Sequence, residues 1–213
     1  PNLKIYQIDK ENNLRYLTPK KDFITNSGIN NVSCKKSNNH SIEKKYIKTK
    51  SELSVFEKKF FEKIKLRYIV LCKELKVGEI NALGFANPEM ETILLNINTN
   101  DNDFERVIHH EVFHIINDSY KEIFDEKMWS SFNVEEFKYA ECSTCTDKLG
   151  LDTYSNTDGF FTEYSRSTAS EDMAEVFSHL MIGSNLDNID PILENKIKFI
   201  KSNLLKIDKN FNL

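Results

Sequence analysis

Residues 102–117 read Asn-Asp-Phe-Glu-Arg-Val-Ile-His-His-Glu-Val-Phe-His-Ile-Ile-Asn. The apolar residues that form a core face at helical spacing are Phe104, Ile108, Ile115 and Ile116. Asn102, followed three residues later by Glu105, has the pattern of a capping box that begins a helix. This stretch therefore predicts an amphipathic helix from Asn102 to about Asn117.

The predicted helix carries the motif His110-Glu111-Val112-Phe113-His114. Residues four apart lie on the same side of a helix, so His110 and His114 can direct two imidazoles at one Zn²⁺. Glu111 lies about 100° round the helix and can accept a proton from water that the ion has acidified. The alternative is a pair of surface or core histidines beside a solvated glutamate.

A catalytic zinc needs a third protein ligand and keeps one position for water. The downstream candidates are Glu163, Glu171, Asp172, Glu175 and His179. Glu171 and Glu175 lie four apart on a helix predicted from Thr168 to Ile182, so one could bind the ion and the other could support a ligand. Thr168 and Glu171 also form a capping box, so Glu171 could cap the helix instead. Spacing favours Glu171 and leaves Glu175 and His179 open.

Two further blocks carry a family resemblance: Phe160-Phe161-Thr162-Glu163-Tyr164 and Glu171-Asp172-Met173-Ala174-Glu175-Val176-Phe177. Together with the His110–His114 motif they resemble gluzincin-type zinc metallopeptidases. That group includes the catalytic domain of anthrax lethal factor and the clostridial Pro-Pro endopeptidases. Its signature is HExxH, then a Tyr seven residues before a Glu that opens an E-x-x-A-E-x-F helix. The resemblance covers roughly residues 91–182 and is concentrated in these short blocks.

The resemblance implies that His110, His114 and Glu171 ligate one catalytic Zn²⁺, with Glu111 as general base and acid. Tyr164 would donate its phenol proton to the oxyanion, a role that phenol chemistry allows. A packed aromatic in a Phe-rich loop is the alternative for Tyr164. Glu175 would orient a histidine ligand.

The strand predicted at Glu91–Asn98 comes directly before the metal helix, and the resemblance implies that it borders the cleft. Leu94 and Asn96 alternate there with Ile93, Leu95 and Ile97, which is typical of a partly exposed strand. We therefore expect Leu94 and Asn96 to contact substrate and the strand to pair with it.

The remaining pattern predicts an α+β fold, because strands come first and helices follow. The other expected strands are Leu3–Ile8, Leu14–Thr18, Tyr68–Leu75 and Glu79–Ala86, and the other expected helices are Ser51–Ile64 and Pro191–Lys206. Residues 119–137 are expected to be partly helical and residues 138–166 irregular. The resemblance implies a zincin-like domain, with a small mixed sheet over the metal helix and a mainly helical C-terminal half.

The charges are unevenly distributed. Residues 1–50 hold eleven Lys and Arg against four Asp and Glu, whereas residues 51–213 hold eighteen against twenty-nine. We predict that residues 1–50 are a basic Asn/Lys-rich leader that can include a β-hairpin, and that residues 51–213 are the metallopeptidase domain. The leader is expected to be solvated or to contact an anionic surface. The acidic main body argues against a nucleic-acid partner, and no apolar run reaches the ~20 residues of a transmembrane helix.

Four cysteines allow two bridges, or one C-x-x-C pair and two single thiols: Cys34, Cys72, Cys142 and Cys145. Cys142 and Cys145 could form a local disulfide, half of a structural zinc site or two unpaired thiols, and we favour the first or the last. Because the sequence begins at Pro1, we expect processing. With the frequent export of the resembling family, this favours a secreted or cell-surface bacterial protein.

The leading functional prediction is a monomeric zinc-dependent endopeptidase that acts on a peptide or protein substrate. The alternative is a non-catalytic, zinc-containing module that binds a peptide or protein on the same fold. A toxin or effector that cleaves a host protein is a special case of the first prediction.

Overall fold

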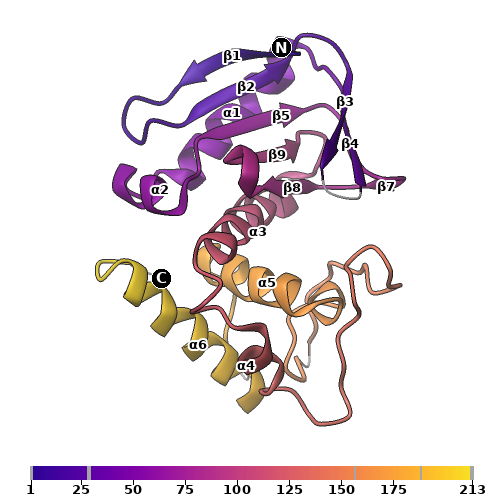
Figure 1. Cartoon of the computed structure of the whole chain (residues 1–213), viewed down its shortest axis with the longest axis vertical. Helices are drawn as coiled ribbons and strands as arrows, with labels where there is room; N and C mark the ends of the chain where they lie inside the picture. The colour runs from indigo at the N-terminus through magenta and orange to yellow at the C-terminus, as the bar shows by residue number, and fades with distance from the viewer. Residues whose placement is uncertain (1, 28–29, 156, 188, 212–213) are drawn as a thin grey trace. The chain divides into compact units, whose positions relative to one another are not determined.

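The computed structural model describes residues 2–27, 30–155, 157–187 and 189–211 (Figure 1). The chain forms two compact units, of which the first ends at Ser119 and the second begins at Tyr120. Among the described residues, the first unit contains two sheets and three α-helices, and the regular structure of the second unit is helical. The predicted α+β class is therefore confirmed.

A mixed sheet in the first unit has the strand order β1-β2-β5-β9-β8 (Figure 1). The strands are β1 (Leu3–Ile8), β2 (Arg15–Pro19), β5 (Tyr68–Cys72), β8 (Gly84–Asn87) and β9 (Thr92–Asn96). Strands β2, β5 and β9 run parallel, and the outer strands β1 and β8 are antiparallel to their neighbours. The central strands are almost wholly buried, as expected for parallel strands covered on both faces. Strand β8 is the last strand at its end of the sheet.

A second, antiparallel sheet has the order β3-β4-β6-β7. Its strands are β3 (Phe23–Ser27), β4 (Asn30–Cys34), β6 (Leu75–Val77) and β7 (Ile80–Asn81). Buried side chains from both sheets form one core cluster: Val32, Cys34, Val70, Cys72, Leu75 and Leu94. Within it a disulfide joins Cys34 of β4 to Cys72 of β5. A second disulfide, between Cys142 and Cys145, matches the local bridge that was one of the two favoured alternatives.

We expect the inter-sheet disulfide to contribute strongly to stability. Cys34 and Cys72 are 38 residues apart. Closing a loop of that length lowers the conformational entropy of the unfolded chain, which raises its free energy by about 4 kcal/mol. Cys34→Ala/Cys72→Ala should lower the free energy of unfolding, measured with urea, by about that amount. Cys142→Ala/Cys145→Ala, which opens a separation of only 3 residues, should cost clearly less. Equal losses in the two variants would contradict this account.

The N-terminal fifty residues are more ordered than their polar sequence indicates. The expected strands Leu3–Ile8 and Leu14–Thr18 correspond to β1 and β2, which pair antiparallel. Beyond them residues 23–34 hold β3 and β4, and helix α1 spans Asn39–Leu53, elements that were not among the expected strands and helices. Since β2 also pairs with β5, the predicted leader shares its compact unit with residues up to Ser119.

The apolar stripe predicted as one helix from Ser51 to Ile64 belongs to two helices. Helix α1 ends at Leu53 and helix α2 spans Lys58–Ile64. The four stripe residues are nevertheless all buried: Leu53, Phe56, Phe60 and Ile64. The periodicity thus correctly predicted which side chains are buried, but the prediction of one continuous helix was wrong. The strands predicted at 68–75 and 79–86 are similarly divided, into β5 and β6 and into β7 and β8.

Helix α3 (Asp101–Ser119) begins slightly earlier than predicted. Asn100 supplies the cap, because its Oδ1 accepts from the Asp103 N–H at 3.0 Å and its Nδ2 donates to Asp103 Oδ2 at 2.5 Å. The predicted box of Asn102 and Glu105 is therefore wrong, and Glu105 pairs with Lys48 of α1 instead. Helix α3 packs against β8, β9 and α1. The 110–114 motif lies near the middle of this helix.

The second unit contains α4 (Glu126–Ser130), the 3₁₀ helix η2 (Tyr164–Arg166), α5 (Ala169–Met181) and α6 (Pro191–Ile207). Helices α5 and α6 agree with the prediction to within about a residue at each end. The long irregular segment expected at 138–166 is also confirmed, with η2 at its end and a single bridge between Thr153 and Thr162 among its described residues. Across the described ranges, no helix has the length and apolar character needed to cross a membrane.

Candidate metal centre

His110 and His114 lie one turn apart on α3 and approach each other closely. Their Nε2 atoms are 3.1 Å apart, and their rings are inclined at 74°. Two nitrogen ligands at about 2.0–2.1 Å from a tetrahedral zinc lie about 3.3 Å apart. The pair therefore fits two positions around one ion without rearrangement. His110 is buried and His114 is half-buried.

The neighbouring His109 belongs to a different contact. It is buried, its Nε2 lies 3.1 Å from Glu52 Oε2 of α1, and its ring meets the Phe56 ring edge-on. The hydrogen bond with His109 lowers the pKa of the Glu52 carboxyl, with a smaller effect from Lys48 in the same direction. His109 thus joins α3 to α1, on a different side of the helix from the His110–His114 pair.

Glu111 lies against the first residue of β8. It is 6% exposed, and a Cβ atom at Gly84 would be 2.5 Å from its Cγ and Oε1 and 2.7 Å from its Cδ. Contacts this short are not tolerated, so the absence of a side chain at Gly84 is what lets Glu111 occupy this position. We did not predict a role for Gly84, although an isolated glycine within a predicted strand is a signal of close approach.

The strand predicted to pair with substrate is an interior strand. Strand β9 lies between β5 and β8, so both of its edges are already occupied. Leu94 is buried in the core between the sheets, and the Asn96 Nδ2 donates to the Ala82 carbonyl oxygen at 3.0 Å. The predicted pairing of substrate with this strand is therefore wrong. The physical reason is that β5 and β8 already occupy its main-chain hydrogen-bonding edges, while the second sheet covers Leu94.

Tyr164 lies at the start of η2, held by the segment at Gly150. Its N–H donates to the Gly150 carbonyl oxygen at 2.9 Å, and the Gly150 N–H donates to Glu163 Oε2 at 2.9 Å. A Cβ at Gly150 would lie 2.8 Å from that same Glu163 oxygen. The backbone around Tyr164 is thus fixed by a close approach of two chain segments, and the tyrosine itself is half-buried.

Glu171 and Glu175 occupy the first two turns of α5. Thr168 caps the helix, because its Oγ1 accepts from the Glu171 N–H at 3.2 Å. Glu175 is 1% exposed, and its Oε2 accepts a hydrogen bond from Thr162 Oγ1 at 2.8 Å. Since the two glutamates are four residues apart, they lie on the same side of α5. Glu171 is half-buried.

The other candidate third ligands have contacts of their own within the second unit. Glu163 accepts from Gly150, and Asp172 accepts from Lys196 Nζ at 2.7 Å with both side chains fully buried. His179 Nδ1 lies 2.8 Å from Ser184 Oγ, and its ring stacks on Phe161. Each of these side chains therefore has a contact within the second unit, and the assignment of Glu171 as the third ligand stays a prediction.

A comparison with protein families adds evidence from most of the sequence. A family model described as "Putative zinc-binding metallo-peptidase" matches residues 46–203. The match covers more than half of the sequence, so the chain belongs to this zinc metallopeptidase family. Comparisons with curated proteins and with solved structures find no significant match. The general prediction of a zinc metallopeptidase is confirmed, and the finer resemblance to lethal factor and the Pro-Pro endopeptidases stays a prediction.

Proposed function

We propose that the protein is a zinc-dependent endopeptidase with a zincin-like catalytic domain, and that His110, His114 and Glu171 hold its single ion. The observation that carries this proposal is the 3.1 Å approach of the two Nε2 atoms on α3, in a chain of a zinc metallopeptidase family. Two histidines and a glutamate are a known ligand set of catalytic zinc and leave a fourth position for water.

In this proposal zinc supplies the Lewis acidity that acidifies water and polarises the scissile carbonyl. Glu111, held against Gly84, accepts the proton of the attacking water and delivers it to the leaving amine. The Tyr164 phenol donates a hydrogen bond to the oxygen on which negative charge develops. Glu175, which already accepts from Thr162, orients a histidine ligand with its carboxylate.

We place the substrate along β8. This strand is the last of its sheet, and it packs against the helix that carries Glu111. An extended peptide can add to such an edge through main-chain hydrogen bonds. Recognition along an open strand edge requires no free peptide terminus, which supports cleavage of internal bonds.

Export of a monomeric enzyme to the cell surface or medium is part of the proposal. The buried disulfide between Cys34 and Cys72 supports it, because stable structural disulfides persist in oxidising compartments. The substrate is a peptide or protein, and the proposal includes no nucleic-acid partner.

The test combines metal analysis with cleavage of a peptide library followed by mass spectrometry. We expect about one zinc per chain, cleavage at internal peptide bonds, loss of cleavage with a chelator, and recovery when zinc is returned. Stoichiometric zinc with peptide binding and no cleavage would establish the non-catalytic module instead. A chain that binds no zinc would contradict both functions.

A further inference from the structure

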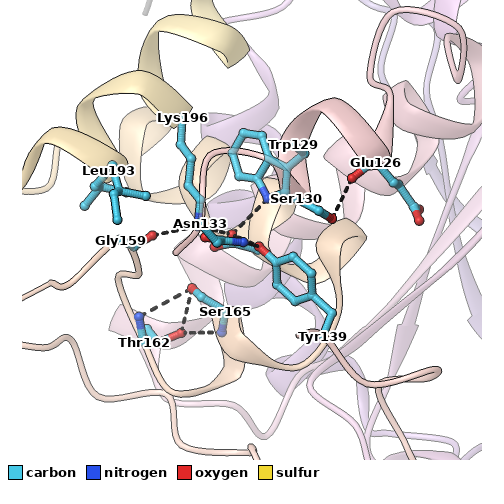
Figure 2. A network of polar contacts seen from close by, with 12 residues as sticks. Glu126, Trp129, Ser130, Asn133, Tyr139, Gly159, Thr162, Ser165, Leu193 and Lys196 are labelled. Atoms are coloured by element: carbon cyan, nitrogen blue, oxygen red, sulfur yellow. Dashed lines mark hydrogen bonds and ion pairs between the residues drawn. The ribbon is translucent and has the colours of Figure 1, made fainter. Parts of the chain in front are cut away.

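A buried polar network lies directly beside the proposed ligand Glu171. Asp172, the next residue on α5, is 0% exposed. Its Oδ2 accepts three hydrogen bonds: from Lys196 Nζ at 2.7 Å, from Trp129 Nε1 at 2.9 Å and from Tyr139 OH at 2.6 Å. Figure 2 shows the three donors converging from α6, from α4 and from the irregular segment that follows α4.

Lys196 connects this network to a second part of the same unit. Its side chain is 0% exposed, and its Nζ also donates to the Gly159 carbonyl oxygen at 2.8 Å (Figure 2). The ammonium lies 3.8 Å from the centroid of the Phe160 ring. Gly159 and Phe160 belong to the segment that leads to Tyr164. One cation therefore contacts both the first turn of α5 and the segment that precedes η2.

The position of Asp172 determines how α5 is rotated about its axis. Consecutive helical residues project about 100° apart, so holding Asp172 inward sets the direction in which Glu171 projects. Glu175, one turn further, is held by Thr162 at 2.8 Å. Asp172 and Glu175 lie three residues apart on one face of α5 and are held by different segments, which fixes the rotation of the helix about its axis.

The buried ion pair between Asp172 and Lys196 is better explained by its effect on how the surrounding elements pack than by a contribution to the stability of the fold. Removing two charges from water costs several kcal/mol per ion, and well-packed apolar replacements of such pairs are often neutral or stabilising. The cation and the carboxylate nevertheless lie at the point where α4, α5, α6 and the segment before η2 meet. At this position the ion pair can favour one relative arrangement of these elements over others.

We propose that Lys196, through Asp172 and Gly159, is a positioning residue that holds Glu171 and the segment leading to Tyr164 in the arrangement that zinc binding requires. The inference rests on the proposed role of Glu171 as a ligand. It assigns no contact between Lys196 and the ion or the substrate.

The main test is Asp172→Asn/Lys196→Met, which removes both charges together and so leaves neither buried alone. We expect thermal unfolding of the metal-free chain close to that of the parent, with zinc affinity about 10–100-fold lower in competition with a chromogenic chelator. Lys198→Met is the matched control, because Lys198 is exposed on the same helix and pairs with Glu194. It should leave zinc affinity unchanged.

A second variant keeps the inference testable if the double variant does not fold. Tyr139→Phe deletes one donor to Asp172 while keeping the ring and the ion pair, and we expect a smaller but measurable fall in zinc affinity with unfolding little changed. If the double variant is folded and binds zinc like the parent, the inference is overturned. If the double variant does not fold, unchanged zinc affinity in Tyr139→Phe overturns it.

The same measurements separate this inference from the proposed function. Parent protein with no zinc affinity would overturn the proposed function and the inference with it. Glu171→Gln with the affinity of the parent would remove the ligand assignment on which the inference rests. Loss of affinity in Glu171→Gln together with parental affinity in the folded double variant would overturn the positioning role alone.

Discussion

Replacing Glu111 with Gln should lower kcat for peptide cleavage by roughly 10²–10⁴-fold while the protein keeps its zinc. Glutamine preserves the size of the side chain but cannot accept a proton from water. Glu111 is not among the proposed ligands, so metal content should remain at the parental level. The measurement is steady-state cleavage of a library-derived peptide beside metal analysis of the same sample.

Glu105→Gln is the matched control for this variant. Glu105 lies on the same helix and pairs with Lys48, so neutralising it tests the effect of lost charge on α3 without touching the base. We expect its kcat to stay near that of the parent. Full activity in Glu111→Gln would disprove the assigned mechanism, and zinc loss in that variant would show that the glutamate binds the ion.

The second large effect is expected at a residue with no side chain. In Gly84→Ala the new methyl group would lie 2.5 Å from the Glu111 Cγ and Oε1, so the carboxylate must move. Misplacing a catalytic group by about 1 Å can cost about 10²-fold, and we expect a fall in kcat of that order. Zinc affinity should change little, because the methyl group is placed against Glu111 and not against the histidine pair. Cleavage kinetics and zinc competition measure the two quantities.

Ala86→Gly distinguishes a displaced base from a weakened strand. It lies two residues further along β8 and loosens the strand without adding an atom near Glu111. We expect its kcat to remain within a few-fold of the parent, by the modest cost of glycine in a strand. Comparable losses in Gly84→Ala and Ala86→Gly would show that the integrity of β8, rather than contact with Glu111, limits activity.

The half of the candidate site that depends on local spacing could be predicted from the sequence. A separation of four residues on a helix is enough to bring His110 and His114 together, whatever surrounds the helix. The third ligand could not be chosen in this way. Its choice depends on contacts between residues far apart in the sequence, such as that of Asp172 with Lys196, 24 residues away. Only the folded chain shows that contact.

The start of α3 shows the same limit at a smaller scale. Asn100 and Asn102 are each followed three residues later by an acidic residue, so both resemble a cap. The sequence pattern alone does not choose between them. In the structure Asp101 contacts Lys44 and Lys45 of α1, and Glu105 contacts Lys48, so the neighbouring helix engages the acidic residues on both sides of the predicted cap.

Long-range pairing explains the errors in the first unit. The alternation around Leu94 was interpreted as one face in solvent, but that face meets the second sheet, whose strands include the polar segment 23–34. A strand with few apolar residues gives little periodic signal. The second sheet, and with it the burial of Leu94, could therefore not be predicted from local patterns.

The buried disulfide between the two sheets also provides a chemical probe of how often the first unit opens. Cys34 and Cys72 are both 0% exposed, so a thiolate reaches their bond only when the two sheets separate. When the reductant attacks the opened core faster than the core recloses, the rate of cleavage equals the rate of opening. The bond at Cys142 and Cys145 needs no such event, since Cys145 is exposed. The order in which the two disulfides are reduced therefore shows which of the two regions exposes its disulfide to solvent more readily, without any mutation or label.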